Sequence, residues 1–232
     1  MSEIIAETNG KQGILLADTM VTRLDENGNI EDQYNKRKIY GTHRNKLIMG
    51  CVGDVETNLN IVDELENMSS IMSEDIYRIY DKRLSERIEQ TKKDKNSTVF
   101  GMYLDNDKVR MFYCMKNSKN TAYELKNQKI VVTPGDSQHM PYLVKCHTGK
   151  ICTKEHMIEL VEEFIDISEK SRFVSDICCI ATMNSWGIIQ YYEANMYEML
   201  KNIEEGKMKS DIGILAQSLP KFMRNGVQKP IK

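Results

Sequence analysis

The spacing of apolar and polar residues predicts a chain in which strands and helices come in blocks. Apolar residues repeated at intervals of three and four predict amphipathic helices, whereas short β-branched and aromatic runs predict strands. The expected strands cover about residues 2–8, 14–17, 46–53, 99–104, 109–114, 130–132, 176–183 and 187–192. The expected helices cover about residues 55–65, 76–88, 137–145, 157–167 and 196–203.

The blocks favour an α+β fold over a doubly wound parallel sheet, because strands and helices do not alternate. The run Ile14-Leu15-Leu16-Ala17 is apolar on both faces, which indicates a strand covered on both sides. Two antiparallel sheets packed face to face, with helices outside each, explain such a strand. Asn9-Gly10 is typical of a hairpin turn before it, and the polar residues 22–37 are expected to form an exposed connection. With no repeat or linker, we expect one domain over residues 1–232, with the residues after about 207 unassigned.

Composition and charge narrow the class of protein. The chain has 232 residues, of which 41% are hydrophobic, and its formal net charge of −2 leaves no basic excess to bind nucleic acid. No run approaches the roughly 20 apolar residues of a membrane helix. The first residues lack the basic start and apolar core of a secretory signal. We therefore expect a cytoplasmic protein that binds neither nucleic acid nor membrane.

The six cysteines lie in apolar surroundings, which is typical of reduced, buried thiols rather than of a disulfide framework. Cys146, His147, Cys152 and His156 form a cluster of metal-ligand types, but their spacing matches no common zinc signature. The methionines are interpreted as core filling rather than as a cofactor site. We expect neither a cofactor nor a metal ion to take part.

Four positions carry the candidate chemistry. Ser2 follows the initiator Met, and a residue this small normally allows the Met to be removed. The exposed α-amine would then act as the base for its own hydroxyl. A lysine nearby, such as Lys38, would lower the pKa of that amine, and Asp18 at the end of the buried strand would hold the lysine. The backbone N–H of Gly53, just before a helix capped by Asp54, suits an oxyanion hole.

These positions resemble those of a known family. The segments Ser2–Ala6, Gly13–Thr19, Thr22, Lys38-Ile39 and Asn45–Asp54 look like those of proteasome β subunits and of the bacterial HslV-type peptidases. In that family the mature chain starts with a Thr or Ser nucleophile, and an Asp follows sixteen positions later. A Lys then precedes an Ile or Val, and a strand end that carries glycine supplies the oxyanion donor. The likeness is specific over residues 2–65, and residues 175–180 resemble a late core strand of HslV-type chains.

The resemblance implies a four-layer αββα N-terminal-nucleophile fold. It also implies a threonine/serine-type endopeptidase that degrades unfolded proteins or peptides inside a homo-oligomeric ring, fed in HslV by an ATP-dependent unfoldase. The catalytic residues it implies are Ser2 as nucleophile, with Lys38, Asp18 and Gly53 in the roles described above.

The chain departs from the family pattern in the segment that supports the nucleophile. Pro134 stands where a serine is expected, with Ser137 as a shifted substitute. The later Asp and Ser of many β subunits have only loose counterparts in Asp166, Glu169 and Ser171.

These departures leave alternatives open. The same fold is compatible with a catalytically inactive structural or binding subunit, or with a hydrolase for small amides. Each singled-out residue also has a purely structural interpretation, such as a strand-end turn for Asp18. Lys36 and Arg37 are alternatives to Lys38 as the lysine or cation of the site.

Overall fold

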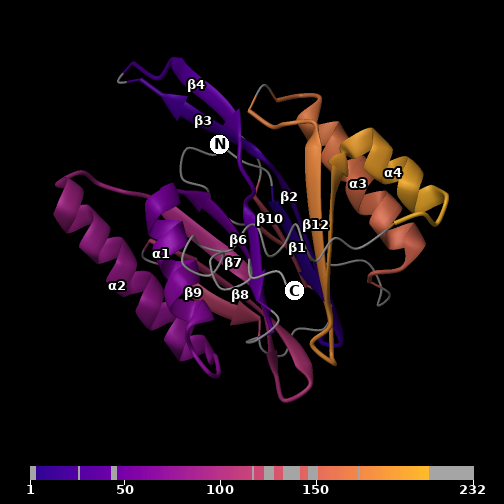
Figure 1. The fold of residues 1–232 in the computed structure, drawn as a ribbon, viewed down its shortest axis with the longest axis horizontal. Coiled ribbons are helices and arrows are strands. Elements are labelled where there is room, and N and C mark those ends of the chain that lie inside the picture. The colour runs from indigo at the N-terminus through magenta and orange to yellow at the C-terminus, as the bar shows by residue number, and fades with distance from the viewer. Residues whose placement is uncertain are drawn as a thin grey trace, which may run out of the picture.

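Figure 1 shows the computed structural model of the chain, which describes residues 4–25, 27–42, 46–116, 118–122, 128–132, 142–145, 151–171 and 173–208. Among these residues no helix has the length and apolar character needed to cross a membrane. The elements form four layers, a pair of helices on each outside and two sheets between them.

One sheet has six antiparallel strands in the order β11-β10-β1-β2-β12-β13. The hairpin of β1 and β2 lies at its centre, with Ile4 opposite Ala17, and β2 pairs next with β12, which places Asp18 opposite Cys178. The bounds of the strands are β1 Ile4–Thr8, β2 Gln12–Asp18, β10 Gln128–Val132, β11 Tyr142–Lys145, β12 Ile177–Asn184 and β13 Ile189–Asn195.

The second sheet has five antiparallel strands in the order β5-β6-β7-β8-β9. A separate two-stranded sheet, made of β3 and β4, extends from one end of the molecule (Figure 1). The bounds of these strands are β3 Met20–Leu24, β4 Ile30–Asn35, β5 Ile39–Thr42, β6 Leu47–Gly53, β7 Ser97–Asp105, β8 Lys108–Met115 and β9 Ser118–Ala122.

The helices cover the two outer faces of the sheets. Helices α1 (Val55–Glu66) and α2 (Ser73–Thr91) pack on the five-stranded sheet, whereas α3 (Lys154–Ser168) and α4 (Met196–Glu204) pack on the six-stranded sheet (Figure 1). The expected α+β class, with a four-layer αββα sandwich of antiparallel sheets, is confirmed.

Three apolar cores hold the layers together. The central core lies between the sheets and takes Leu15 and Ala17 from β2. Ile14 and Leu16, which point to the other face of the same strand, belong to the core beneath α3 and α4. A third core joins α1 and α2 to the five-stranded sheet. Each fully buried aliphatic side chain of this kind contributes about 1.5–3 kcal/mol, so the expectation of a strand covered on both sides is confirmed.

Two local signals explain where elements begin. The Asn9 side chain accepts hydrogen bonds from the N–H groups of Lys11 and Gln12, at 3.0 and 2.8 Å, which closes the β1–β2 turn as expected. Asp54 caps α1, because its carboxylate accepts from the N–H of Thr57 at 2.9 Å.

Two expectations about the elements are wrong. Residues 22–37 are exposed, but most of them form β3 and β4 rather than an irregular connection. Both faces of this hairpin are largely polar, so it lacks the apolar alternation that reveals a strand. Residues 142–145, placed in a helix by the sequence, form β11, because pairing with β10 at the sheet edge overrides the weak helical pattern. Residues 137–141 and those after 208 lie outside the described residues.

Candidate functional site

The site is built on Asp18, the last residue of β2. Its side chain is fully buried, and a buried carboxylate is costly unless both oxygens have partners. One oxygen, Oδ1, accepts a hydrogen bond from Nζ of Lys38 at 2.5 Å. The other, Oδ2, accepts from the backbone N–H of Met20 at 2.7 Å. The carboxylate is therefore held in its charged form by a cation and a backbone donor.

Lys38 reaches Asp18 from the residue before β5, on the other sheet. Its side chain is only 6% exposed. Its backbone carbonyl accepts from the N–H of Cys51 at 3.0 Å, which fixes the lysine beside β6. The pair thus joins the two sheets at one end of the sandwich. Of the three adjacent cations, Lys38 is the one that contacts Asp18.

Arg37 turns instead to Glu193 of β13, with Nε 2.5 Å from the carboxylate. Burial works against the charged guanidinium, but the hydrogen bond with Glu193 prevails and raises the pKa of Arg37 above its ordinary value. The same carboxylate oxygen accepts from the Tyr191 hydroxyl at 3.1 Å. Arg37 therefore pairs with β13, whereas Lys38 pairs with Asp18.

A network of small polar side chains supports the pair. The N–H of Thr19 donates to Oγ of Ser175 at 3.0 Å, and the Ser175 hydroxyl also bonds to the carbonyl of Ile177 at 3.1 Å. The Thr19 hydroxyl donates to the Asn35 side chain at 3.1 Å. These contacts tie the residue after Asp18 both to the start of β12 and to the end of β4. Ser175 is thus a supporting residue to which the sequence assigned no role.

Gly53 ends β6 and precedes the cap of α1. Its φ of +97° lies in the left-handed region, and a Cβ there would lie 2.3 Å from the carbonyl oxygen of Asn96. Glycine is therefore required by the backbone itself. Gly53 is exposed and lies two residues along β6 from Cys51, which is bonded to Lys38. Two residues of strand span roughly 7 Å. The exposed Gly53 backbone thus lies a short way along β6 from the contact with the Lys38 carbonyl.

Several candidates fall elsewhere. Ser2 and the segment from 133 to 137 that contains Pro134 and Ser137 lie outside the described residues. Asp166 lies on α3, and Glu169 directly follows that helix and accepts from the Tyr197 hydroxyl at 2.7 Å. Ser171 accepts from the N–H of Phe173 at 3.2 Å. Asp166 and Glu169 thus belong to the α3–α4 layer, and the contact of Ser171 is local.

The described cysteines are poorly suited to act as nucleophiles. Burial raises the pKa of the Cys51, Cys114 and Cys179 thiols well above the ordinary value, and raises that of Cys152 to about 12. A thiol whose pKa is raised in this way stays protonated, and the protonated thiol is not the nucleophile.

Cys146 and His147 of the candidate metal cluster lie outside the described residues. His156 instead bonds to Glu7, with Nε2 and Oε2 2.8 Å apart. Within the described part of the chain no three ligand-type side chains are grouped to hold a metal.

The four layers, with the Asp18–Lys38 pair between two antiparallel sheets, define a proteasome-like N-terminal-nucleophile fold. The chain is similar to the solved structure of Anbu (ancestral beta-subunit) from Yersinia bercovieri. Identity is 13%, the TM-score is 0.65, and the match covers 94% of this chain and 98% of the other. It is also similar to an Anbu (Gly-1) mutant from Hyphomicrobium sp. strain MC1. There identity is 10%, the TM-score 0.58 and the coverage 100% and 99%. No protein-family model and no curated protein matches the chain.

These neighbours correct the resemblance on which the sequence analysis relied. Assignment to the proteasome β subunits or to the HslV-type peptidases is wrong, because the similar structures are Anbu proteins, a distinct branch of the same superfamily. At 10–13% identity the likeness shows the shared fold.

Proposed function

We propose that the chain is a proteasome-like peptidase whose nucleophile is the hydroxyl of Ser2, exposed by removal of Met1. The observation that carries this proposal is the buried Asp18–Lys38 pair, which joins the two sheets where β2 ends. A fully buried ion pair is a weak source of stability compared with apolar packing. Its position between the two sheets, beside the end of β2, therefore supports a chemical role.

The register of β1 supports the choice of Ser2. The strand begins at Ile4, which lies opposite Ala17 and so next to Asp18 in the neighbouring strand. Ser2 stands two positions before Ile4, and two extended residues span about 7 Å. The mature N-terminus is thereby within reach of the ion pair.

Each residue has a distinct role in the proposed reaction. The α-amine of Ser2, acting through a water molecule, takes the proton from Oγ as Oγ attacks the scissile carbonyl carbon. The positive charge of Lys38 lowers the pKa of the amine and stabilises the developing negative charge. Asp18 keeps Lys38 charged and oriented. General-base assistance of this kind contributes about 10²–10⁴-fold to the rate.

The intermediate is then resolved in two steps. The N–H of Gly53 donates to the oxyanion of the tetrahedral intermediate. As that intermediate collapses, the C–N bond breaks and the leaving amine takes the proton from the α-ammonium group. An ester joins the acyl group to Ser2 Oγ, and water, activated by the same amine, hydrolyses it.

The proposal extends to the substrate and the assembly. We expect peptides or unfolded proteins as substrates and a homo-oligomeric ring in the cytoplasm, with an ATP-dependent unfoldase as a partner. Support comes from the similar structure from Yersinia bercovieri, which is named an ancestral beta-subunit, since a subunit belongs to an assembly. The buried, free thiols suit a reducing compartment.

The test combines intact mass with peptide hydrolysis for the wild-type chain, Ser2→Ala and Ser2→Thr. The wild type is expected to lack Met1 and to cleave a fluorogenic peptide. An epoxyketone inhibitor, which reacts with N-terminal nucleophiles, is expected to form a covalent adduct with it. Ser2→Ala loses both cleavage and the adduct, whereas Ser2→Thr retains a hydroxyl and activity. Equal cleavage by the wild type and Ser2→Ala contradicts the proposal. A retained Met1 with no adduct identifies an inactive subunit of the same fold.

A further inference from the structure

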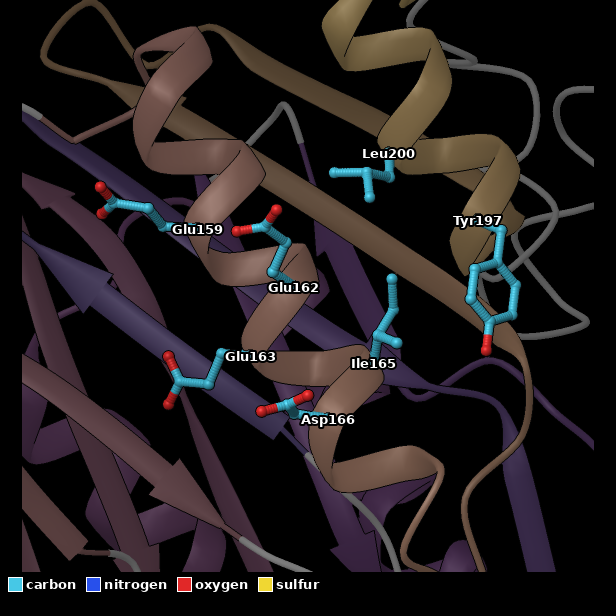
Figure 2. A pocket seen from close by; sticks show the side chains of 7 residues that line it. All are labelled: Glu159, Glu162, Glu163, Ile165, Asp166, Tyr197 and Leu200. Atoms are coloured by element: carbon cyan, nitrogen blue, oxygen red, sulfur yellow. The ribbon is translucent and has the colours of Figure 1, made fainter.

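Helices α3 and α4 form an open groove of about 650 Å³ on the outer face of the six-stranded sheet (Figures 1 and 2). The helices are tied together at both ends. Lys154 Nζ donates to the carbonyl of Glu204 at 2.6 Å, and the Tyr197 hydroxyl donates to Glu169 at 2.7 Å. The groove is therefore a property of a fixed helix pair rather than of a loop.

The groove has an apolar floor. Ile165 of α3 and Leu200 of α4 lie between the two helices, and Tyr197, which is 52% exposed, lines the groove beside them (Figure 2). An apolar strip of this kind gains free energy when a side chain covers it.

Its α3 wall is acidic. Glu159, Glu162, Glu163 and Asp166 follow one another at intervals of three, one and three, so they occupy one face of α3. Like charges at these spacings destabilise a helix. Among the described residues no Lys or Arg forms an ion pair with Glu159, Glu162 or Asp166. A cationic segment placed along this wall would relieve the repulsion.

The chain carries a segment of complementary chemistry. Residues 209–232 contain one acidic residue, Asp211, against five basic ones, although the whole chain has a net charge of −2. Within this segment the run Lys221-Phe222-Met223-Arg224 joins two cations to two large apolar side chains. Cations at both ends of an apolar pair match an acidic wall beside an apolar floor.

The segment also starts close to the groove. It follows α4, and Tyr197 lies seven residues before the end of that helix, a distance of about 11 Å along the axis. Sixteen residues, 205–220, join α4 to the run at 221–224, and a linker of this order gives an effective concentration near the millimolar range. This favours the chain's own segment over that of a second copy.

We propose that residues 221–224 bind in the α3–α4 groove of the same chain. Lys221 and Arg224 pair with the carboxylates of α3, and Phe222 and Met223 cover Ile165 and Leu200. The proposal concerns the outer helical layer and does not depend on the peptidase activity.

Zero-length carbodiimide coupling of the full chain at low salt tests this placement. We expect an amide link between Lys221 and Glu162, Glu163 or Asp166, in a product that migrates as a monomer on a denaturing gel. The link is expected to fade at about 0.5 M salt, where the screening length is only roughly 4 Å. A link found only in a dimeric product, or none at any of these carboxylates, overturns the proposal.

Charge reversal gives a second test. Glu162→Lys with Asp166→Lys is expected to remove the links at positions 162 and 166, and adding Lys221→Glu with Arg224→Glu to restore one between positions 162 and 221. Glu89→Lys, at an exposed site on α2, serves as the matched control and leaves the link intact. Loss of the link in this control, or no restoration in the fourfold variant with wild-type circular dichroism, contradicts the proposal.

Hydrogen exchange of the wild type needs no variant. The amides of residues 221–224 are expected to exchange more slowly than those of an open chain, and exchange at the open-chain rate refutes the docking.

Discussion

Two buried carboxylates on neighbouring strands of one sheet have different hydrogen-bond partners. Asp18 ends β2 and has partners on both oxygens, a permanent cation at 2.5 Å and a backbone N–H at 2.7 Å. Glu7 of β1 is 1% exposed and bonds through Oε2 to His156 of α3 at 2.8 Å. Its other oxygen, Oε1, has no hydrogen-bond partner among the described residues.

The partners differ in charge as well as in number. Nδ1 of His156 accepts the N–H of Cys152 at 3.3 Å, so the hydrogen-bond pattern assigns the ring proton to Nε2, which donates to Glu7. That geometry anchors the first turn of α3 on β1. Lys38 instead brings a full positive charge to Asp18. The comparison teaches that the ion pair between the sheets is electrostatically complete, whereas the pair beneath α3 serves to attach a helix.

Removal of the lysine is expected to have the largest effect. Lys38→Met leaves the Asp18 carboxylate buried without its cation, which costs about 3–5 kcal/mol of unfolding free energy. Peptide hydrolysis is lost with it, because no charge remains to tune the Ser2 amine. Denaturant unfolding and a peptide assay measure the two effects. Lys38→Arg, which keeps the charge, is the control for stability. A loss below about 1 kcal/mol in Lys38→Met would show that the pair is not electrostatically complete.

An intermediate effect is expected at Glu7. Glu7→Ala leaves the buried Nε2–H of His156 without an acceptor, which costs about 1–3 kcal/mol. Glu7→Gln keeps an acceptor oxygen and removes the half-satisfied charge, so its unfolding free energy stays within about 1 kcal/mol of the wild type. Both values come from urea unfolding. If Glu7→Gln proves as damaging as Glu7→Ala, the full carboxylate charge is needed and the comparison with Asp18 fails.

The smallest effect is expected at Asp63 of α1, a half-buried carboxylate whose Oδ1 has no partner among the described residues. Burial, opposed by the charge of Arg83, raises the pKa of Asp63 from 3.8 to about 6. Between these values the folded state holds the proton more tightly than the unfolded state. Stability from this group is therefore present below pH 3.8 and is lost as the pH rises through about 6.

Asp63→Asn removes this dependence. The variant is expected to gain on the wild type as the pH rises from about 4 to 7, by less than about 1 kcal/mol because solvent screens the side chain. Unfolding midpoints at several pH values measure the difference. A gap between the two proteins that does not change with pH would exclude Asp63 as its source.

The apolar pattern predicts most of the layered fold. Ile14 to Ala17 alternate between two cores, and a strand with both faces apolar can be buried only between two layers. The β3–β4 hairpin could not be predicted from the apolar pattern, because β4 is almost entirely exposed and the two strands depend on backbone pairing. The strand at 142–145 could not be predicted for another reason, since its partner β10 is distant in sequence and local propensity carries no information about it.

Part of the candidate site could be predicted from the sequence and part could not. Asp18 and Lys38 are named from a charged residue at the end of a buried strand and a basic residue before the next ordered segment, and the structure brings them together. Their catalytic role remains a prediction. The supporting contact between Ser175 and Thr19 spans 156 positions of sequence, and no local pattern distinguishes that serine from others in polar turns.

The β3–β4 excursion leaves and re-enters the body of the protein immediately beside the ion pair. The N–H of Lys36 closes its base by donating to the carbonyl of Thr19 at 2.7 Å. Because the ends are clamped, extra length at the tip adds only a small closure entropy, about 0.6 kcal/mol for each doubling of the loop. The turn around Gly28 is therefore a natural place to insert an affinity tag or a fluorophore that reports on the neighbourhood of Lys38 without displacing it.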